Sequence, residues 1–76
     1  MRESDEYKLA VQDCYAWQYK PTNSFYQCLF TMFQKADRSN RNKLAIAFPF
    51  HYQVFQDWNE AAEYGNELFK KHGLIS

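Results

Sequence analysis

The sequence predicts a small all-α protein, a bundle of three to five short helices with an aromatic-rich core. The chain has 76 residues, 20% of them aromatic, and Gly and Pro supply only two residues each. Apolar residues recur at three- and four-residue spacings through most of the chain, as they do on one face of a helix. Aromatic rings bury a large area each, so they let a chain near the lower size limit for independent folding build a core. We therefore expect residues 1–76 to form a single domain.

The first expected helix begins near Ser4 and ends around Tyr19. Ser4 is a good capping residue, and the acids that follow it suit the positive end of a helix dipole. Tyr15, Trp17 and Tyr19 also alternate as in a strand, so this half of the segment is open between helix and strand, with helix preferred. Pro21 disfavours helical backbone at the residue before it, which ends the element.

The clearest helix is expected from Phe25 to Ala36, after a run of capping residues. Tyr26 and Phe30, four residues apart, form a second apolar row beside the main one. A helix that is apolar over so wide an arc lies either at the centre of the core or against a partner. The main row consists of Phe25, Cys28, Leu29, Met32 and Phe33.

The polar residues 37–42 predict a tight turn, in which Ser39 or Asn40 caps a short third helix that ends at Ala47. Proline cannot continue a helix but suits the first position of a new one, so Pro49 marks the start of a fourth helix, Phe50 to about Trp58. The expected anchors of these two helices are Leu44, Ile46 and Phe48, and then Phe50, Val54 and Trp58.

A last helix is expected within residues 61–71, with acids early and lysines late as the helix dipole favours. Gly65 lowers helix propensity by about 1 kcal/mol relative to Ala, so a break near it is possible. Gly73 suits the end of the helix, and Leu74 after it could make the hydrophobic contact of a Schellman motif.

Charge and hydropathy exclude several classes of function. Nine Lys and Arg balance nine Asp and Glu, which argues against binding driven by phosphate attraction and against an acidic mimic of DNA. A neutral chain with more rings than a small interior can hide favours a protein partner or a homo-oligomer.

No apolar run suits a signal peptide or a membrane span, so we expect a cytoplasmic protein without membrane contact. A cytosolic chain keeps its cysteines reduced, and we expect Cys14 and Cys28 to be buried free thiols.

The sequence contains no pattern of catalytic or metal-binding residues. A nucleophile needs a base within hydrogen-bond reach, and only His51 and His72 could serve Cys14 or Cys28, with nothing in the spacing to select such a pair. The cysteines lie fourteen residues apart and the histidines twenty-one, unlike the short paired spacings of a zinc site. We expect a non-enzymatic protein with no metal and no cofactor, in which His51 is a polar residue beside the start of the fourth helix.

A basic cluster is one candidate binding feature. Lys35, Arg38, Arg41 and Lys43 fall within nine residues, near the rings of the second helix. Cations beside rings can hold phosphates and stack bases, so this cluster could bind a nucleotide or a nucleic acid. The commoner arrangement is a solvated corner between two helices with the aromatic residues inside.

A set of aromatic residues is the other candidate, as contacts for a partner protein: Tyr15, Trp17, Tyr19, Tyr26 and Phe30. Tyr and Trp concentrate at interface hot spots, where a large ring meets a polar tip. The same rings could equally be packing residues, and the sequence leaves both alternatives open.

From Leu29 to Phe69, about half the chain, the sequence resembles small uncharacterised open reading frames of bacteriophages and related mobile elements. Such frames often consist of a helix, a polar turn, a short helix and then Phe-Pro. Here Phe50-His51-Tyr52 follows the Phe-Pro pair, where those frames usually place acids. The matching residues are Leu29-Phe30, Lys35-Ala36-Asp37, Asn40-Arg41, Lys43-Leu44-Ala45, Ala47-Phe48-Pro49 and, more loosely, Tyr64-Gly65 and Leu68-Phe69.

The resemblance implies an accessory phage protein in the cytoplasm of a bacterial host, the setting of anti-CRISPR proteins and other inhibitors of host defence, which act mainly by binding. Together with the excess of rings on a neutral chain, it favours a protein that blocks a host protein by occupying its surface. The alternative is a module that sequesters a nucleotide or nucleic acid through Arg38, Arg41, Lys43 and neighbouring rings.

Overall fold

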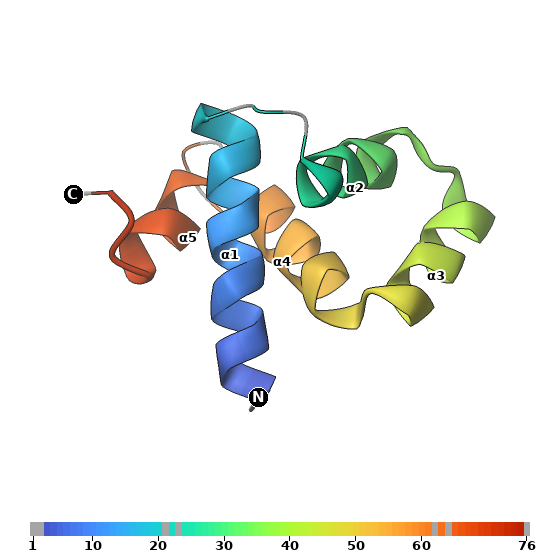
Figure 1. The fold of residues 1–76 in the computed structure, drawn as a ribbon, viewed down its shortest axis with the longest axis horizontal. Helices are drawn as coiled ribbons and strands as arrows, with labels where there is room; N and C mark the ends of the chain where they lie inside the picture. The colour runs from blue at the N-terminus through green and yellow to red at the C-terminus, as the bar shows by residue number, and fades with distance from the viewer. Residues whose placement is uncertain (1–2, 21, 23, 62, 64, 76) are drawn as a thin grey trace.

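The computed structural model describes residues 3–20, 22, 24–61, 63 and 65–75, and these form five α-helices and no strand (Figure 1). The predicted all-α class is confirmed, with a number of helices at the upper end of the expected range. The helices are α1 (Glu3–Tyr19), α2 (Phe25–Lys35), α3 (Arg38–Ala47), α4 (Pro49–Glu60) and α5 (Asn66–Lys71).

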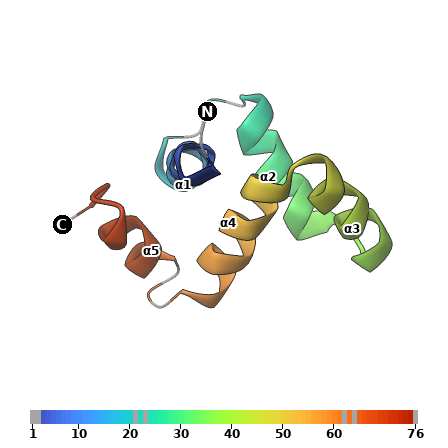
Figure 2. The ribbon, with the colours of Figure 1, turned by 90° about the horizontal axis from the view of Figure 1, so that it is seen from below.

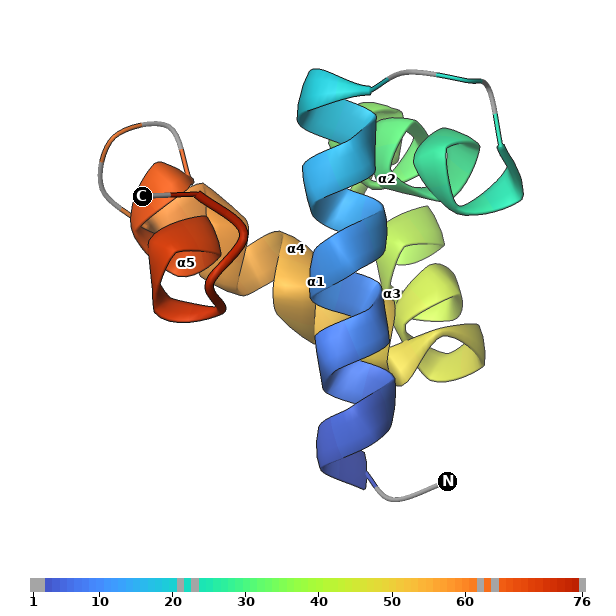
Figure 3. The same ribbon diagram turned by 60° about the vertical axis from the view of Figure 1, so that its left-hand side comes forward.

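Helix α4 is the central element, because it contacts each of the other four helices. Helix α1 crosses α4 and also packs on α2. Helices α2 and α3 lie on one side of α1, and α5 lies on the other side, as both the front view and the end-on view show (Figures 1 and 2). The same division is visible when the molecule is turned about the vertical axis (Figure 3).

The core is rich in aromatic residues, as predicted. Four of its buried residues are Phe, and Trp17 and Trp58 pack against them. The Trp17 ring stacks on Phe30, with ring centroids 5.5 Å apart, and meets the Trp58 ring at 5.0 Å, so it joins α1 to both α2 and α4. The buried apolar residues are Ala10, Val11, Cys14, Leu29, Phe30, Phe33, Val54, Phe55, Leu68 and Phe69.

Helix α1 is continuous through Tyr19, so the helical alternative for its second half is confirmed. The alternating aromatic residues point to different neighbours on the helix surface: Tyr15 meets Phe69 of α5, while Trp17 meets α2 and α4. The helix begins at Glu3, so Ser4 lies inside it and is not its cap, contrary to the prediction.

Helix α2 buries only part of its predicted main apolar row, because Leu29 and Phe33 are buried but the inward face is shifted toward the second row. Phe30, from the second row, has no exposed surface, whereas Phe25 and Met32 from the main row are 62% and 50% exposed. Trp17 is the reason, because its ring stacks on Phe30 and fixes which part of the wide apolar arc faces inward. The same orientation leaves Cys28 exposed, so its predicted burial is wrong, while Cys14 is a buried free thiol as predicted.

The predicted turn at residues 37–42 is wrong, since α3 already begins at Arg38. Asp37 is the cap in place of Ser39 or Asn40, and its carboxylate accepts the backbone N–H of Asn40 at 2.8 Å. Asp is as good a capping residue as Ser or Asn, so local preference alone did not decide among three adjacent candidates.

Helix α3 lies at the edge of the bundle, where it packs on α4. None of its residues, all of which the structure describes, is buried. Leu44 and Phe48 pack against the core as predicted, but Ile46 is 83% exposed and anchors nothing. Arg41 adds a polar attachment, because its Nε donates to the carbonyl of Phe33 at 3.1 Å.

The remaining helix ends follow local signals. Ser24 caps α2 by accepting the backbone N–H of Gln27 at 3.4 Å. Pro49 is the first residue of α4, a position at which the backbone N–H has no partner within the helix and the fixed φ of proline suits helical backbone. The break expected near Gly65 is confirmed, since Gly65 has φ +88° and α5 begins only at Asn66. Helix α5 ends in the predicted Schellman motif.

In that motif Gly73 has φ +74°, a left-handed conformation that Gly adopts without steric cost. The backbone N–H of Leu74 donates to the carbonyl of Phe69 at 3.0 Å, and that of Gly73 donates to the carbonyl of Lys70, also at 3.0 Å. Leu74 packs against the core, which supplies the expected hydrophobic contact.

Candidate functional site

A groove of about 540 Å³ opens between α1, α2 and the junction of α3 with α4. Helix α1 contributes side chains spaced three or four residues apart, which is why they share one face. Helix α2 contributes Tyr26, and the Phe-Pro junction brings in the apolar residues that precede and follow it. The lining residues are Glu6, Leu9, Gln12, Asp13, Tyr26 and residues 47–51.

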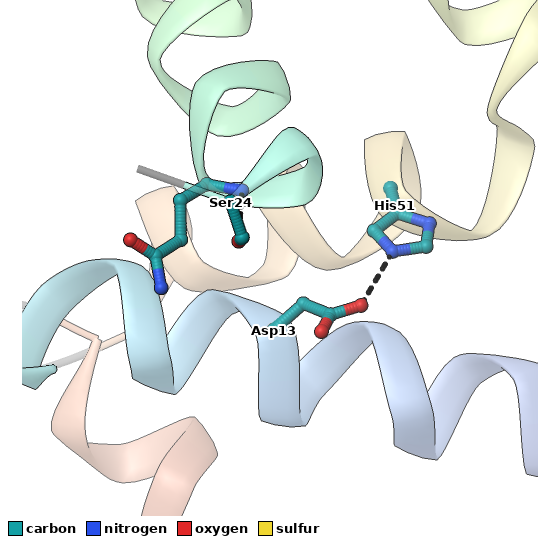
Figure 4. Close-up of polar contacts among 4 residues, drawn as sticks. Asp13, Ser24 and His51 are labelled. Carbon is teal, nitrogen blue, oxygen red and sulfur yellow. Dashed lines mark hydrogen bonds and ion pairs between the residues drawn. The ribbon is translucent and has the colours of Figure 1, made fainter. Parts of the chain in front are cut away.

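His51 and Asp13 connect the two sides of this groove. Nε2 of His51 lies 3.0 Å from Oδ2 of Asp13, so the imidazole N–H donates to the carboxylate across the gap between α4 and α1 (Figure 4). The Tyr26 ring stacks on the imidazole, with centroids 4.4 Å apart and an interplanar angle of 8°. The His51 side chain is only 14% exposed. Three helices therefore contribute one residue each to a chain of contacts in which Asp13 of α1 positions His51 of α4, and His51 stacks on Tyr26 of α2.

Exposed apolar side chains surround the same groove. Leu9, Phe25 and Tyr26 are 45%, 62% and 40% exposed. Phe25 meets the Tyr26 ring at 5.2 Å and the Phe48 ring at 5.7 Å, so the rings form a continuous surface. Large apolar residues that are exposed together mark interaction sites in soluble proteins more often than isolated ones do.

Among the described residues, Asp13 is the hydrogen-bond partner of the His51 imidazole, and no side-chain nucleophile is bonded to it. A His–Asp pair can activate a side-chain nucleophile only if that nucleophile lies within hydrogen-bond reach of the imidazole. Ser24, which Figure 4 shows with His51 and Asp13, has a hydroxyl that could serve as a nucleophile. Its oxygen caps α2 instead, and no hydrogen bond joins it to His51. Burial, with a smaller contribution from the Asp13 charge, raises the pKa of the Cys14 thiol to about 12, so its thiolate is scarce at neutral pH.

Metal binding has no support in the described part of the chain, where no three His, Cys, Asp or Glu side chains come together as ligands. Nor does any helix in that part combine the length and the apolar character that crossing a bilayer requires.

The five aromatic residues predicted as partner contacts do not form one surface. Trp17 and Phe30 lie in the core, and Phe30, with no exposed surface, is wrong as a contact residue. Tyr15 and Tyr19 lie together beside α5, and the Tyr19 hydroxyl donates to the side chain of Asn66. Only Tyr26 belongs to the groove.

The basic cluster is divided as well. Arg41 is turned toward the protein, where it donates to the carbonyls that end α2 and lies 5.6 Å over the ring of Phe55. Lys35 and Lys43 line a second hollow of about 370 Å³ between α2 and α3, and Arg38 is exposed at the first position of α3.

Of the groove's described lining residues, Tyr26 alone was predicted as a contact residue from the sequence. His51 was weighed as a base for a cysteine and interpreted as a polar residue near a helix start, and no site role was assigned to Glu6, Leu9 or Asp13. The last three repeat at spacings of three and four, which is a detectable signal of a shared helix face. The pairing of Asp13 with His51, thirty-eight residues later, has no local signal.

Comparison with protein-family models, with curated proteins and with solved structures gives no match to this chain.

Proposed function

We propose that this protein is a non-enzymatic binding protein that docks on a partner protein through the groove around Tyr26. The observation that carries the proposal is the exposed Tyr26 ring, which His51 and Asp13 hold in place within a mainly apolar groove. Tyr is enriched at the energetic centres of protein interfaces, because it offers a large apolar face and a polar tip.

Preorganisation is the physical advantage of this arrangement. Binding immobilises side chains, at a free-energy cost of roughly 0.5–1.5 kcal/mol for each rotamer-rich one. The stacked imidazole already restricts Tyr26, and the Asp13 carboxylate already restricts the imidazole. Part of that cost is therefore met during folding, and more of the contact energy remains for affinity.

A more specific role follows if the resemblance of residues 29–69 to phage reading frames reflects common origin. The protein would then be an accessory factor that inhibits a host defence protein by occupying its surface. A typical interface covers about 800 Å² on each partner, and the accessible surface of this chain is 5276 Å². The groove and its surrounding rings are a suitable centre for such a footprint.

Binding of a nucleotide or nucleic acid is the less favoured alternative. Arg41 is already bonded to carbonyls at the end of α2, which leaves Lys35, Arg38 and Lys43 as the cations of this cluster that are available to phosphate. A chain of zero net charge with so small a cluster gains little from counterion release.

Site-specific photo-crosslinking in bacterial cells tests the proposal. A benzophenone amino acid at Leu9 places the reactive group in the groove without disturbing the stack of Tyr26 on His51. The matched control carries it at Gln34, which is exposed on α2 and does not line the groove. We expect a discrete protein adduct from position 9 that is absent at position 34. Equal adducts at both positions, or none at either, would count against the proposal.

A further inference from the structure

The charged groups that the described residues contribute to the groove have one sign. Glu6 and Asp13 are its two carboxylates, and no Lys or Arg is among the described residues that line it. The chain as a whole has equal numbers of acidic and basic residues, so this imbalance is local and not a consequence of composition.

Neither carboxylate is saturated by the neighbours that the structure describes. Among the described residues none forms a hydrogen bond or ion pair with Glu6, which is half-buried. Asp13 uses Oδ2 for His51, and within the same residues its other oxygen has no partner. A carboxylate that is partly removed from water gains more from a cation than a fully solvated one does, since the surrounding dielectric is lower.

The apolar residues of the groove complement such a cation. The exposed Tyr26 ring offers a surface that attracts Arg and Lys as well as apolar groups. Phe48 and Phe50 line the same hollow and suit an apolar side chain next to the cation. An acidic or purely polar segment would leave these rings without complementary contacts and would repel Glu6.

We infer that the groove binds a segment of the partner protein in which an arginine or lysine lies next to a large apolar side chain. The cation pairs with Glu6 and the free oxygen of Asp13, and the apolar side chain packs against Tyr26 and Phe48. This inference depends on the proposed function and specifies the chemistry of the partner.

Selection from a library of displayed random peptides, with the purified full chain as bait, tests this chemistry directly. We expect the enriched peptides to contain Arg or Lys within four residues of Leu, Ile, Phe or Trp. The best peptide is then compared with a version in which citrulline, a neutral isostere, replaces the arginine. Chemical-shift changes on peptide addition should map to the groove, including the amides of Leu9, Tyr26 and His51.

Two protein variants separate the charge effect from a change in fold. Glu6→Gln should raise the Kd of the arginine peptide about three- to fivefold, as expected for loss of one partly exposed charge pair, and should leave the Kd of the citrulline peptide unchanged. Glu60→Gln is the matched control, because Glu60 is an exposed acid at the end of α4 and does not line the groove. It should leave both Kd values unchanged.

Several outcomes would overturn the inference. Groove-binding peptides without cations, or an unchanged Kd in Glu6→Gln, would show that the acids do not select the partner, while the proposed binding role of the groove would stand. Shifts that map to the α5 side of α1, or a selection that returns no peptide, would also reject it. If the groove shifts depend on protein concentration without peptide, the occupant is a second copy and not a partner segment.

Discussion

Gly65 packs directly on the indole of Trp58, and replacing it with Ala tests how closely the α4–α5 connection is packed. A Cβ atom at position 65 would lie 2.0 Å from Cδ1 and 2.3 Å from Nε1 of Trp58. Trp58 cannot easily move away, because its ring meets Trp17 at 5.0 Å and Phe55 at 5.9 Å. Gly65 also has φ +88°, which an L residue rarely adopts.

The two effects give the expected magnitude. An Ala in the left-handed region costs about 1–2 kcal/mol, and forcing extra volume into a packed site costs about 1–3 kcal/mol more. The free energy of unfolding should therefore fall by roughly 2–5 kcal/mol. A chain of 76 residues has a total stability of about 4–11 kcal/mol at the usual value per residue, so the loss is a large fraction of it.

Urea denaturation followed by tryptophan fluorescence measures this loss, and Gly73→Ala is the matched control. Gly73 has a similar φ of +74°, but no described atom lies within 4 Å of the position that a Cβ would take there, so only the conformational cost of about 1–2 kcal/mol applies. The difference between the two variants isolates the collision with Trp58. If Gly65→Ala is no more destabilised than Gly73→Ala, the close packing of Trp58 on Gly65 is refuted.

Three further predictions concern single side chains. Iodoacetamide should alkylate the exposed Cys28 in the native protein and the buried Cys14 only after denaturation, and equal rates measured by mass spectrometry would contradict the assigned burial. Arg41→Ala should lower the free energy of unfolding by about 1–2 kcal/mol, because it removes donors from the last carbonyls of α2. The control, Arg38→Ala, should change the free energy of unfolding by less than about 0.5 kcal/mol. Equal losses for the two variants in urea denaturation would show that Arg41 is not structural. Burial, together with two neighbouring lysines, lowers the pKa of His72, so the unfolded chain binds the proton at a higher pH than the folded one. The free energy of unfolding should therefore decrease as the pH falls from about 7 to about 5. In His72→Gln this loss should be smaller, and an unchanged pH dependence in the variant would show that His72 does not cause it.

Local chemistry was sufficient to predict the fold class and several helix ends. The cap at Ser24, the start of α4 at Pro49, the break at Gly65 and the Schellman motif at Gly73 all depend on residues within a few positions of each other. Such preferences operate in any tertiary context, so they can be recognised in the sequence. Where three good caps stood together, near Asp37, local preference could not choose among them.

The candidate site shows what local chemistry could not decide. A wide apolar arc predicted that α2 is a helix, but only the stack of Trp17 on Phe30 determined that Phe25 and Tyr26 face the solvent side of the groove. The pairing of Asp13 with His51 arises from the crossing of α1 and α4. The sequence by itself determined where the helices form, because backbone hydrogen bonding and capping depend on near neighbours. Tertiary structure decided which faces are buried and which side chains meet, because those outcomes depend on packing between segments that are distant along the chain.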